Sequence, residues 1–360
     1  MKDETIDFKK FPTTRYQGSK RKILPWIYEN LKDLKFDTAL DACGGSGSVS
    51  YLLKKMDKVV TYNDNLKFNY LIGKAIIENN NVLFSEEDVR NLYNHGQKAP
   101  DIIERIFKGM YYLDNENKWL DHVSHGIFIM NHYRGDELSL KKAMAYYALF
   151  QASLTKRPFN LFHRNNLDIR TNDVARHFGN KTTWEKDFSK SFESFITEAN
   201  ALIFDSGKPC KAINQSIFEM TNVDYDLVYI DPPYINKNVT NETANYLKCY
   251  HFLEGIANYD KWEKLVDFNS RNYRFKESLL STHFHKANIY ESYDSLFKKF
   301  KHSIIVVSYK NGGIPTVESL VKKMKKYKKR VYTRSQHYIY ALNKQNGNAQ
   351  RNREVLIIGE

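Results

Sequence analysis

Residues 36–50 read FDTALDACGGSGSVS, and this stretch predicts the start of a doubly wound α/β fold. An apolar, β-prone run ends at Asp41, a glycine-rich turn follows, and a helix is expected from about Ser48. The next run, KVVTY at 58–62, is again typical of a strand, and a helical pattern covers residues 66–78. This order of strands, turn and helices favours a parallel sheet with helices packed on it.

The rest of the chain divides into two kinds of sequence. Residues 81–205 show helical patterns, as at 101–108 and 140–154, and no strong strand signal. Strand signals return later in the chain, at 211–213, 227–230, 303–308, 332–340 and 354–358. We therefore expect a Rossmann-like α/β sheet with helices on both faces, formed by residues 1–80 and 206–360, and an inserted, mainly helical region at 81–205.

The composition indicates a folded protein with an anionic partner. The 360 residues are 42% hydrophobic and 14% aromatic, which is enough for a substantial core, and the net charge is +13. This excess of positive charge favours nucleic acid over an acidic membrane surface, although a solvated basic face without a partner is the simpler alternative. The densest charge run, 322–330, is expected on a surface helix.

Several classes of protein are disfavoured by what the sequence lacks. Cys43, Cys210 and Cys249 are widely spaced, and neither a CxxC pair nor an HExxH motif is present, so a disulfide scaffold and a metal site are not expected. The N-terminal segment MKDETIDFKK lacks an apolar stretch, and no run approaches the ~18–20 apolar residues that cross a bilayer. We expect a soluble, cytoplasmic protein.

The glycine-rich turn suits a nucleotide-like ligand. Gly44, Gly45 and Gly47 allow backbone N–H groups to approach a ligand at the start of the following helix. No Lys followed by Ser or Thr stands at P-loop spacing, which disfavours an NTPase. Asp64 ends the second strand, where an acid can accept hydrogen bonds from ribose hydroxyls, but capping the next helix is an equally good interpretation.

The strand-ending segment VYIDPPY at 228–234 carries the strongest functional signal. Methylation of an exocyclic amine is difficult, because the lone pair of the amine is delocalised into the base and the nitrogen is a poor nucleophile. The Asp231 carboxylate and the Pro232 carbonyl can accept its two N–H groups while Pro233 stiffens the turn, and such alignment is worth up to roughly 7–11 kcal/mol. The Tyr234 ring can stack on a base turned out of the duplex. A simple turn after a strand fits less well, because open α/β sheets bind ligands at the carboxyl ends of their strands.

The order of these segments resembles that of the Dam-like, alpha-class adenine-specific DNA methyltransferases. In that family an aromatic-x-G-[GS]-K segment precedes the glycine-rich turn, and D-P-P-Y follows much later; here YQGSK occupies 16–20. The resemblance implies S-adenosyl-L-methionine as the methyl donor and adenine in DNA as the target. It implies donor binding by Tyr16, Gly18, Lys20, Asp41, Gly44, Gly47, Asp64 and Asp231, and catalysis by Asp231, Pro232, Pro233 and Tyr234. Without the family order, Tyr16 and Lys20 would be ordinary surface residues before a helix. Cys43 departs from the family, which usually carries Phe at that place.

The segment PFNLFHRNNLDIR at 158–170 resembles the N-x-L-x-R-x-N segment that the family associates with DNA contact and the approach to the target base. It lies within the inserted region, which we therefore interpret as the DNA-recognition region. Arg164, Asn165 and Arg170 are the candidates for DNA binding, and surface loop residues without a ligand are the alternative interpretation. The segment at 231–234 is called the catalytic turn below. For His251, which follows it in the sequence, a structural hydrogen bond is a better prediction than DNA contact.

Together these patterns predict a site-specific DNA methyltransferase that flips an adenine into the D-P-P-Y pocket and methylates its N6 amine. Cytosine N4 or an RNA base stays open as the target, and a catalytically inactive DNA-binding regulator is the alternative of another class. A protein-glutamine methyltransferase is disfavoured, because that chemistry usually goes with Asn before the two prolines. The expected partner is double-stranded DNA, and a cognate restriction endonuclease would be a second partner in a restriction–modification system. Neither the recognition sequence nor the oligomeric state is predicted.

Overall fold

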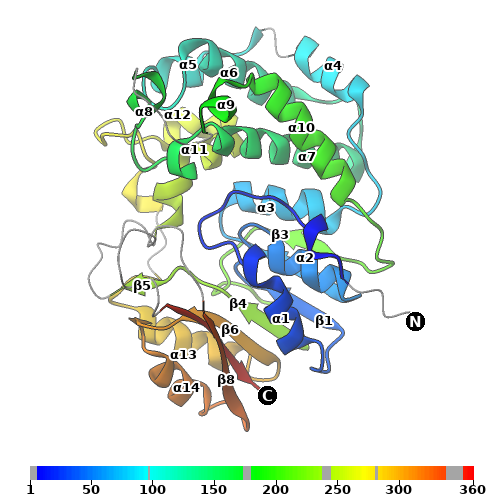
Figure 1. Cartoon of the computed structure of the whole chain (residues 1–360), viewed down its shortest axis with the longest axis vertical. Helices are drawn as coiled ribbons and strands as arrows, with labels where there is room; N and C mark the ends of the chain where they lie inside the picture. Colours follow the sequence, from blue (N-terminus) through cyan, green and yellow to red (C-terminus); the bar gives the residue numbers. More distant parts are fainter. Residues whose placement is uncertain (1–5, 96–97, 173–179, 237–244, 280–282, 338–351) are drawn as a thin grey trace.

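The computed structural model of the chain describes residues 6–95, 98–172, 180–236, 245–279, 283–337 and 352–360. These residues form a seven-stranded sheet with helices on both faces and a further helical layer (Figure 1). The strand order is β3-β2-β1-β4-β6-β9-β8. The strands are β1 (Thr38–Asp41), β2 (Val59–Asn63), β3 (Lys211–Ile213), β4 (Leu227–Ile230), β6 (Ile304–Lys310), β8 (Val331–His337) and β9 (Arg353–Gly359). The expected Rossmann-like α/β fold is confirmed.

The parallel strands bring the loops of interest to one edge of the sheet. The strands from β3 to β6 run parallel to one another, and β9 and β8 are antiparallel additions. Asp41 at the end of β1 is level with Tyr62 of β2 and Tyr229 of β4, so the loops after these strands emerge side by side. Because β2 lies on one side of β1 and β4 on the other, this edge is the switch point at which open α/β sheets bind ligands.

Both faces of the sheet are covered, because its central strands are apolar on both sides. On β4, Leu227 and Tyr229 pack into one core, while Val228 and Ile230 pack into a second. The first core is closed by α1 (Leu24–Leu31), α2 (Ser48–Lys55) and α3 (Lys67–Gly73), and α3 continues as a π-helical turn at Lys74–Glu78. The second core is closed by α13 (Ile289–Lys299) and α14 (Val317–Met324).

The region 81–205 contains helices and, in its described part, no strand. Its helices are α4 (Glu86–His95), α5 (Ile102–Ile106), α6 (Asp114–Ile129), α7 (Gly135–Thr155), α8 (Asp168–Thr171), α9 (Asn180–Glu185) and α10 (Phe188–Leu202). Two helices that follow the turn at 231–234 in the sequence, α11 (Tyr246–Ala257) and α12 (Trp262–Leu265), join this layer (Figure 1). Both lie within residues 206–360, which the sequence analysis places with the sheet. The reason they join the helical layer is burial: α11 is buried from Cys249 to its end and therefore needs helices around it.

One apolar core connects the sheet with the helical layer. The Phe68 ring on α3 contacts Phe150 on α7 and Tyr250 on α11, with ring centroids 5.8 and 5.5 Å apart. Glu254 on α11 adds a polar link, because its carboxylate accepts the backbone N–H groups of Lys67 and Phe68 at the start of α3. The helical layer therefore packs as part of one body with the sheet.

Shorter elements complete the described chain. The strands β5 (Ile235–Asn236) and β7 (Gly313–Ile314) pair, and short 3-10 helices lie at Phe8–Lys10, Arg21–Ile23, Pro158–Asn160, Tyr259–Lys261 and Glu277–Leu279. The predicted surface helix at 322–330 is partly wrong, because α14 ends at Met324. Lys328 in this run is also buried, and its ammonium donates to the carbonyls of Ser303 and Lys301. No described helix is long and apolar enough to cross a membrane.

Candidate active site

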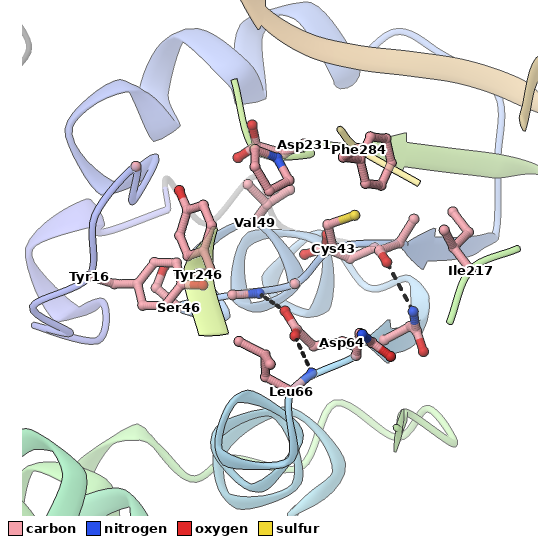
Figure 2. A pocket seen from close by; sticks show the side chains of 18 of the residues that line it. Tyr16, Cys43, Ser46, Val49, Asp64, Leu66, Ile217, Asp231, Tyr246 and Phe284 are labelled. Carbon is pink, nitrogen blue, oxygen red and sulfur yellow. Dashed lines mark hydrogen bonds between the residues drawn. The ribbon is translucent and has the colours of Figure 1, made fainter. Parts of the chain in front are cut away.

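A pocket opens at the carboxyl ends of β1, β2 and β4, with a cavity volume of about 210 Å³. Figure 2 shows that residues from distant parts of the chain line it, among them Tyr16, Asp64, Asp231 and Tyr246. Of the predicted site residues, those that line it are Tyr16, Gly18, Lys20, Asp41, Gly44, Asp64, Asp231 and Pro233. The other predicted residues, Gly47, Pro232 and Tyr234, lie outside its lining. Three lining segments carry no motif that is recognisable in the sequence: 215–218, 245–247 and 284–285.

The glycine-rich turn is shaped by the side chain of Tyr62. A Cβ on Gly44 would lie 2.1 Å from the Tyr62 ring, so only glycine fits there. The Tyr62 hydroxyl donates to the Gly45 carbonyl at 2.8 Å, and Gly45 and Gly47 have positive φ angles of 48° and 74°. Gly47 is the N-cap of α2, so it sets the start of this helix although it does not line the pocket. The side chain of Tyr62 on β2 therefore helps to hold the turn in its conformation.

Asp64 joins the glycine-rich turn to the start of α3. Its Oδ2 accepts the Gly45 N–H at 3.0 Å and its Oδ1 accepts the Leu66 N–H at 2.9 Å, as the dashed lines in Figure 2 show. Burial raises the pKa of this carboxyl, and the two N–H groups oppose the rise. Leu66 is the N-cap residue of α3 and this helix has no side-chain cap, so Asp64 lies ahead of the helix and the capping interpretation is wrong. Each oxygen has a second lone pair, so ribose binding by Asp64 stays a prediction.

Asp41 lies beneath the pocket at the end of β1. It is fully buried, and its Oδ2 accepts the Ser50 hydroxyl of α2 at 2.6 Å. Burial raises the pKa of Asp41 to about 7, and the nearby carboxylates of Asp231 and Asp64 add to the rise. Asp41 therefore connects β1 to α2 through a hydrogen bond, and its protonation depends on the charges of Asp231 and Asp64.

Tyr16 is part of a stack of tyrosine rings. Its ring lies 4.9 Å from Tyr250 at an interplanar angle of 6°, and 5.4 Å from Tyr246. The Asn69 amide donates to the Tyr16 hydroxyl at 3.1 Å. Gly18 has φ +83°, and a Cβ there would lie 2.9 Å from the Tyr246 hydroxyl. The YQGSK segment is therefore fixed against α11, which the interpretation of Tyr16 as an ordinary surface residue does not explain.

Lys20 forms an ion pair with Asp231 in the D-P-P-Y turn. Its Nζ lies 2.8 Å from Asp231 Oδ2 and donates to the Gly18 carbonyl at 3.1 Å, and its side chain is only 5% exposed. Burial raises the pKa of Asp231, while the Lys20 charge lowers it. The Tyr234 hydroxyl donates to Asp231 Oδ1 at 2.9 Å, so both carboxylate oxygens have a donor in this structure.

Glu354 is a site residue that the sequence analysis missed. It is buried on β9, its Oε2 lies 3.3 Å from the Tyr234 hydroxyl, and its Oε1 lies 4.0 Å from Lys20 Nζ. The available signal was an acid at the start of REVLIIG, a strand that is otherwise apolar. By itself, that signal marks only the beginning of a strand.

The three DNA-binding candidates lie outside the pocket. Arg170 forms a two-pronged ion pair with Glu116 at 2.9 and 2.8 Å, and its side chain is 5% exposed, so it has a structural partner within the helical layer. The carbonyls of Arg164 and Asn165 each accept an N–H of the buried Arg157 at 2.6 Å. The segment around them is therefore held from inside the protein by Arg157, which sequence reasoning did not single out.

His251 is buried, as expected of a structural hydrogen bonder. Its Nε2 lies 3.2 Å from the Phe162 carbonyl and 3.0 Å from the Tyr111 hydroxyl. In the described part of the chain, no group of three or more His, Cys, Asp or Glu side chains is arranged to hold a metal.

Residues 16–311 match the model of a protein family described as D12 class N6 adenine-specific DNA methyltransferase. The match covers most of the chain, from the YQGSK segment past the catalytic turn.

Individual relatives of known name are consistent with this match. The chain is 25% identical to the type II methyltransferase M2.HphI of Haemophilus parahaemolyticus over 98% of both chains. It is 26% identical to the modification methylase LlaI of Lactococcus lactis subsp. lactis, over 85% of this chain and 48% of that protein. It is 26% identical to the type II methyltransferase M.FokI of Planomicrobium okeanokoites, over 86% and 46%. The chain thus spans nearly all of the first relative and about half of the other two.

Proposed function

This chain belongs to the D12 class N6 adenine-specific DNA methyltransferases, and from that membership we propose how its pocket serves the reaction. The enzyme transfers a methyl group to the N6 amine of adenine in DNA, which removes cytosine N4 and RNA bases as alternative targets. We propose that the donor is S-adenosyl-L-methionine and that it binds in the pocket at the ends of β1, β2 and β4.

One observation carries this proposal: the glycine-rich turn and the catalytic turn line the same cavity. The lining also suits the donor's mixed chemistry. Apolar walls come from Val49, Ile217 and Phe284, as an adenosine requires, and the carboxylates of Asp64 and Asp231 favour a cation. The bound donor supplies a methyl group on a positively charged sulfur.

The chain's own residues would orient the target amine. We propose that the Asp231 carboxylate and the Pro232 carbonyl accept the two amine N–H groups, so that the nitrogen lone pair points into the pocket. Lys20 favours the ionised form of Asp231, which is the form that accepts a hydrogen bond. After methyl transfer the amine nitrogen carries a positive charge. It becomes neutral when the N–H proton that is hydrogen-bonded to Asp231 passes to that carboxylate. The Tyr234 ring supports the flipped base.

Recognition of DNA is the second part of the proposal. We assign it to residues 81–205, with Arg164 and Asn165 as the first residues to test and Arg170 as a residue that holds their segment in place. The net charge of +13 supports phosphate binding by the chain as a whole.

A restriction–modification role is supported by the names of the relatives, two of which are called type II methyltransferases and one a modification methylase. We propose that this enzyme protects DNA from a cognate endonuclease. Its expected cytoplasmic location follows from that role and is part of the same proposal.

Asp231→Asn tests the proposed site. The neutral amide keeps the shape of the carboxylate but offers one acceptor oxygen fewer and carries no charge, so we expect methyl transfer to fall by at least ~100-fold. The measurement is incorporation of labelled methyl from S-adenosyl-L-methionine into duplex DNA, followed by identification of the modified nucleoside. Asp224→Asn, an exposed acid in the turn before β4, is the control and should retain wild-type activity. A wild-type enzyme that does not use this donor, or an Asp231→Asn variant with full activity, would overturn the proposal.

A further inference from the structure

Glu354 lies next to the two groups that donate hydrogen bonds to Asp231. The Tyr234 hydroxyl lies 2.9 Å from Asp231 Oδ1 and 3.3 Å from Glu354 Oε2. The Lys20 ammonium lies 2.8 Å from Asp231 Oδ2 and 4.0 Å from Glu354 Oε1. Two donors, one from the YQGSK segment and one from the catalytic turn, thus stand between two carboxylates.

The position of Glu354 on β9 is unusual for a carboxylate. Residues two apart on a strand share a face, so Glu354 lies on the same face as Leu356 and Ile358, which are buried in the core. The carboxylate side chain is itself only 2% exposed. Burying a carboxylate is costly unless donors or cations compensate it, and Tyr234 and Lys20 are two of the groups that lie close enough to do so. An acid at this position places a negative charge beside Tyr234 and Lys20, which an apolar residue would not do.

The Tyr234 hydroxyl has a single proton, which can be donated well to only one acceptor at a time. In the present structure the shorter distance is to Asp231, so this hydroxyl and Lys20 each occupy one lone pair on the two oxygens of Asp231. Each of these oxygens keeps a second lone pair, but an oxygen that already accepts from a hydroxyl or an ammonium is a weaker acceptor for the target amine. A second carboxylate next to both donors offers them another acceptor when the amine arrives.

We propose that Glu354 is a positioning residue of the methyl transfer: it accepts the Tyr234 hydroxyl and the Lys20 ammonium when the target amine binds, and so releases Asp231 to hold that amine. The inference rests on the proposed function of Asp231. It involves an exchange of hydrogen bonds only, because no proton changes its covalent partner. Lys310, which is paired with Glu354 in register on β6 and lies 5.9 Å from the Tyr234 ring centroid, is a further cation close to this exchange.

Glu354→Gln is the first test, because it keeps the shape of the side chain and removes its charge. We expect the single-turnover rate of methyl transfer to fall by ~10–100-fold, as for a misplaced reacting group. The affinity for S-adenosyl-L-methionine, measured by calorimetry, and the KM for DNA should change little, because Glu354 does not line the pocket and acts, in this proposal, only through Tyr234 and Lys20. Glu360→Gln, just beyond the opposite end of β9 and in contact with Arg330, is the matched control and should behave as wild type.

Two further variants separate positioning from a structural role. Glu354→Asp keeps the charge one methylene further away, and we expect it to recover part of the lost rate. In a double-mutant cycle with Tyr234→Phe, the two losses should be less than multiplicative, because both remove the same hydrogen bond. Thermal unfolding of each variant shows whether the fold has been retained.

The inference is overturned if Glu354→Gln transfers methyl groups at the wild-type rate, if Glu354→Asp is no better than Glu354→Gln, or if rate, donor affinity and unfolding temperature all fall together. Failure of the proposed function is a different result, since it would leave the wild-type enzyme without activity towards adenine or Asp231→Asn fully active.

Discussion

At the scale of the residue, His251 is a buried imidazole that stays neutral. Burial lowers its pKa to about 3, well under its ordinary value near 6.5. Below about pH 6.5, His251 therefore binds a proton in the unfolded chain but not in the folded protein. Its contribution to stability is fully present above pH 6.5 and is lost as the pH falls towards 3.

This makes a pH-dependent prediction for His251→Gln. Between pH 7 and pH 4.5 the wild-type free energy of unfolding should lose about 2–3 kcal/mol through this group, and the variant should lack that part of the loss. Denaturant unfolding at both pH values measures it, and His302→Gln, on an exposed turn before β6, is the control. An equal pH dependence in the wild type and in His251→Gln would contradict the assignment.

At the scale of the element, Arg157 organises the segment that follows α7. Its guanidinium donates to the carbonyl of Leu161 twice at 3.1 Å, to those of Arg164 and Asn165 at 2.6 Å, and to that of Tyr111 at 3.4 Å. Burial lowers its pKa to about 10, so it remains charged at neutral pH. Four of these five hydrogen bonds go to residues 161–165, a segment without regular helix or strand, and the fifth goes to Tyr111.

The backbone of this segment explains why such support is needed. Phe159, Asn160 and Asn166 all have positive φ angles, between 55° and 62°. This conformation is unfavourable for residues other than glycine and persists only where the surroundings hold it. The Phe159 side chain is also 67% exposed, so packing does not hold it. We infer that the hydrogen bonds from Arg157 hold this backbone in place.

Arg157→Lys should therefore be destabilising although it keeps the charge. A lysine has three donors on one nitrogen and cannot reach the carbonyls that the guanidinium spans, which leaves buried acceptors unpaired. We expect the free energy of unfolding to fall by about 2–4 kcal/mol, with faster hydrogen exchange at residues 161–166. Arg105→Lys, in an exposed ion pair with Glu263, should cost well under ~1 kcal/mol. Equal effects of the two substitutions would refute this role.

At the scale of the whole molecule, the helical layer and the sheet share one apolar core. Buried residues of α6, α7 and α10 belong to the same cluster as those of α3, α11 and the first face of the sheet. The link through Glu254 and the start of α3 adds hydrogen bonds to that shared core. The inserted region is thus an insertion in sequence but not a separate unit of packing.

A fragment of residues 81–205 should consequently not fold by itself. Without α3 and α11 it exposes the apolar surface that now packs against them, and it lacks the area needed to offset its loss of chain entropy. The near-ultraviolet circular dichroism and thermal unfolding of the fragment measure this, with the full chain as the reference. A cooperative transition of the fragment would mean that residues 81–205 form an independent domain.

Local patterns along the chain determined the class of fold and the family of this protein. The strand–turn–helix start, the glycines, and the D-P-P-Y turn depend on neighbouring residues and on strand and helix periodicity, which a sequence displays directly. From them follow the Rossmann-like sheet and, with the ordered YQGSK segment, the family. The strands β1 to β4 lie within one or two residues of their expected limits for the same reason.

The tertiary structure decided which side chains became partners. The sequence left Asp64 between ribose binding and helix capping, and it made Arg170 a candidate for DNA binding. In the structure, Asp64 accepts the N–H of Gly45, and Arg170 pairs with Glu116. It also did not reveal that Glu354, far along the chain, would lie beside the catalytic turn. Such contacts depend on how distant segments of the chain pack against one another. The sequence around a residue indicates its local conformation, but it does not show which residues will be its neighbours in space.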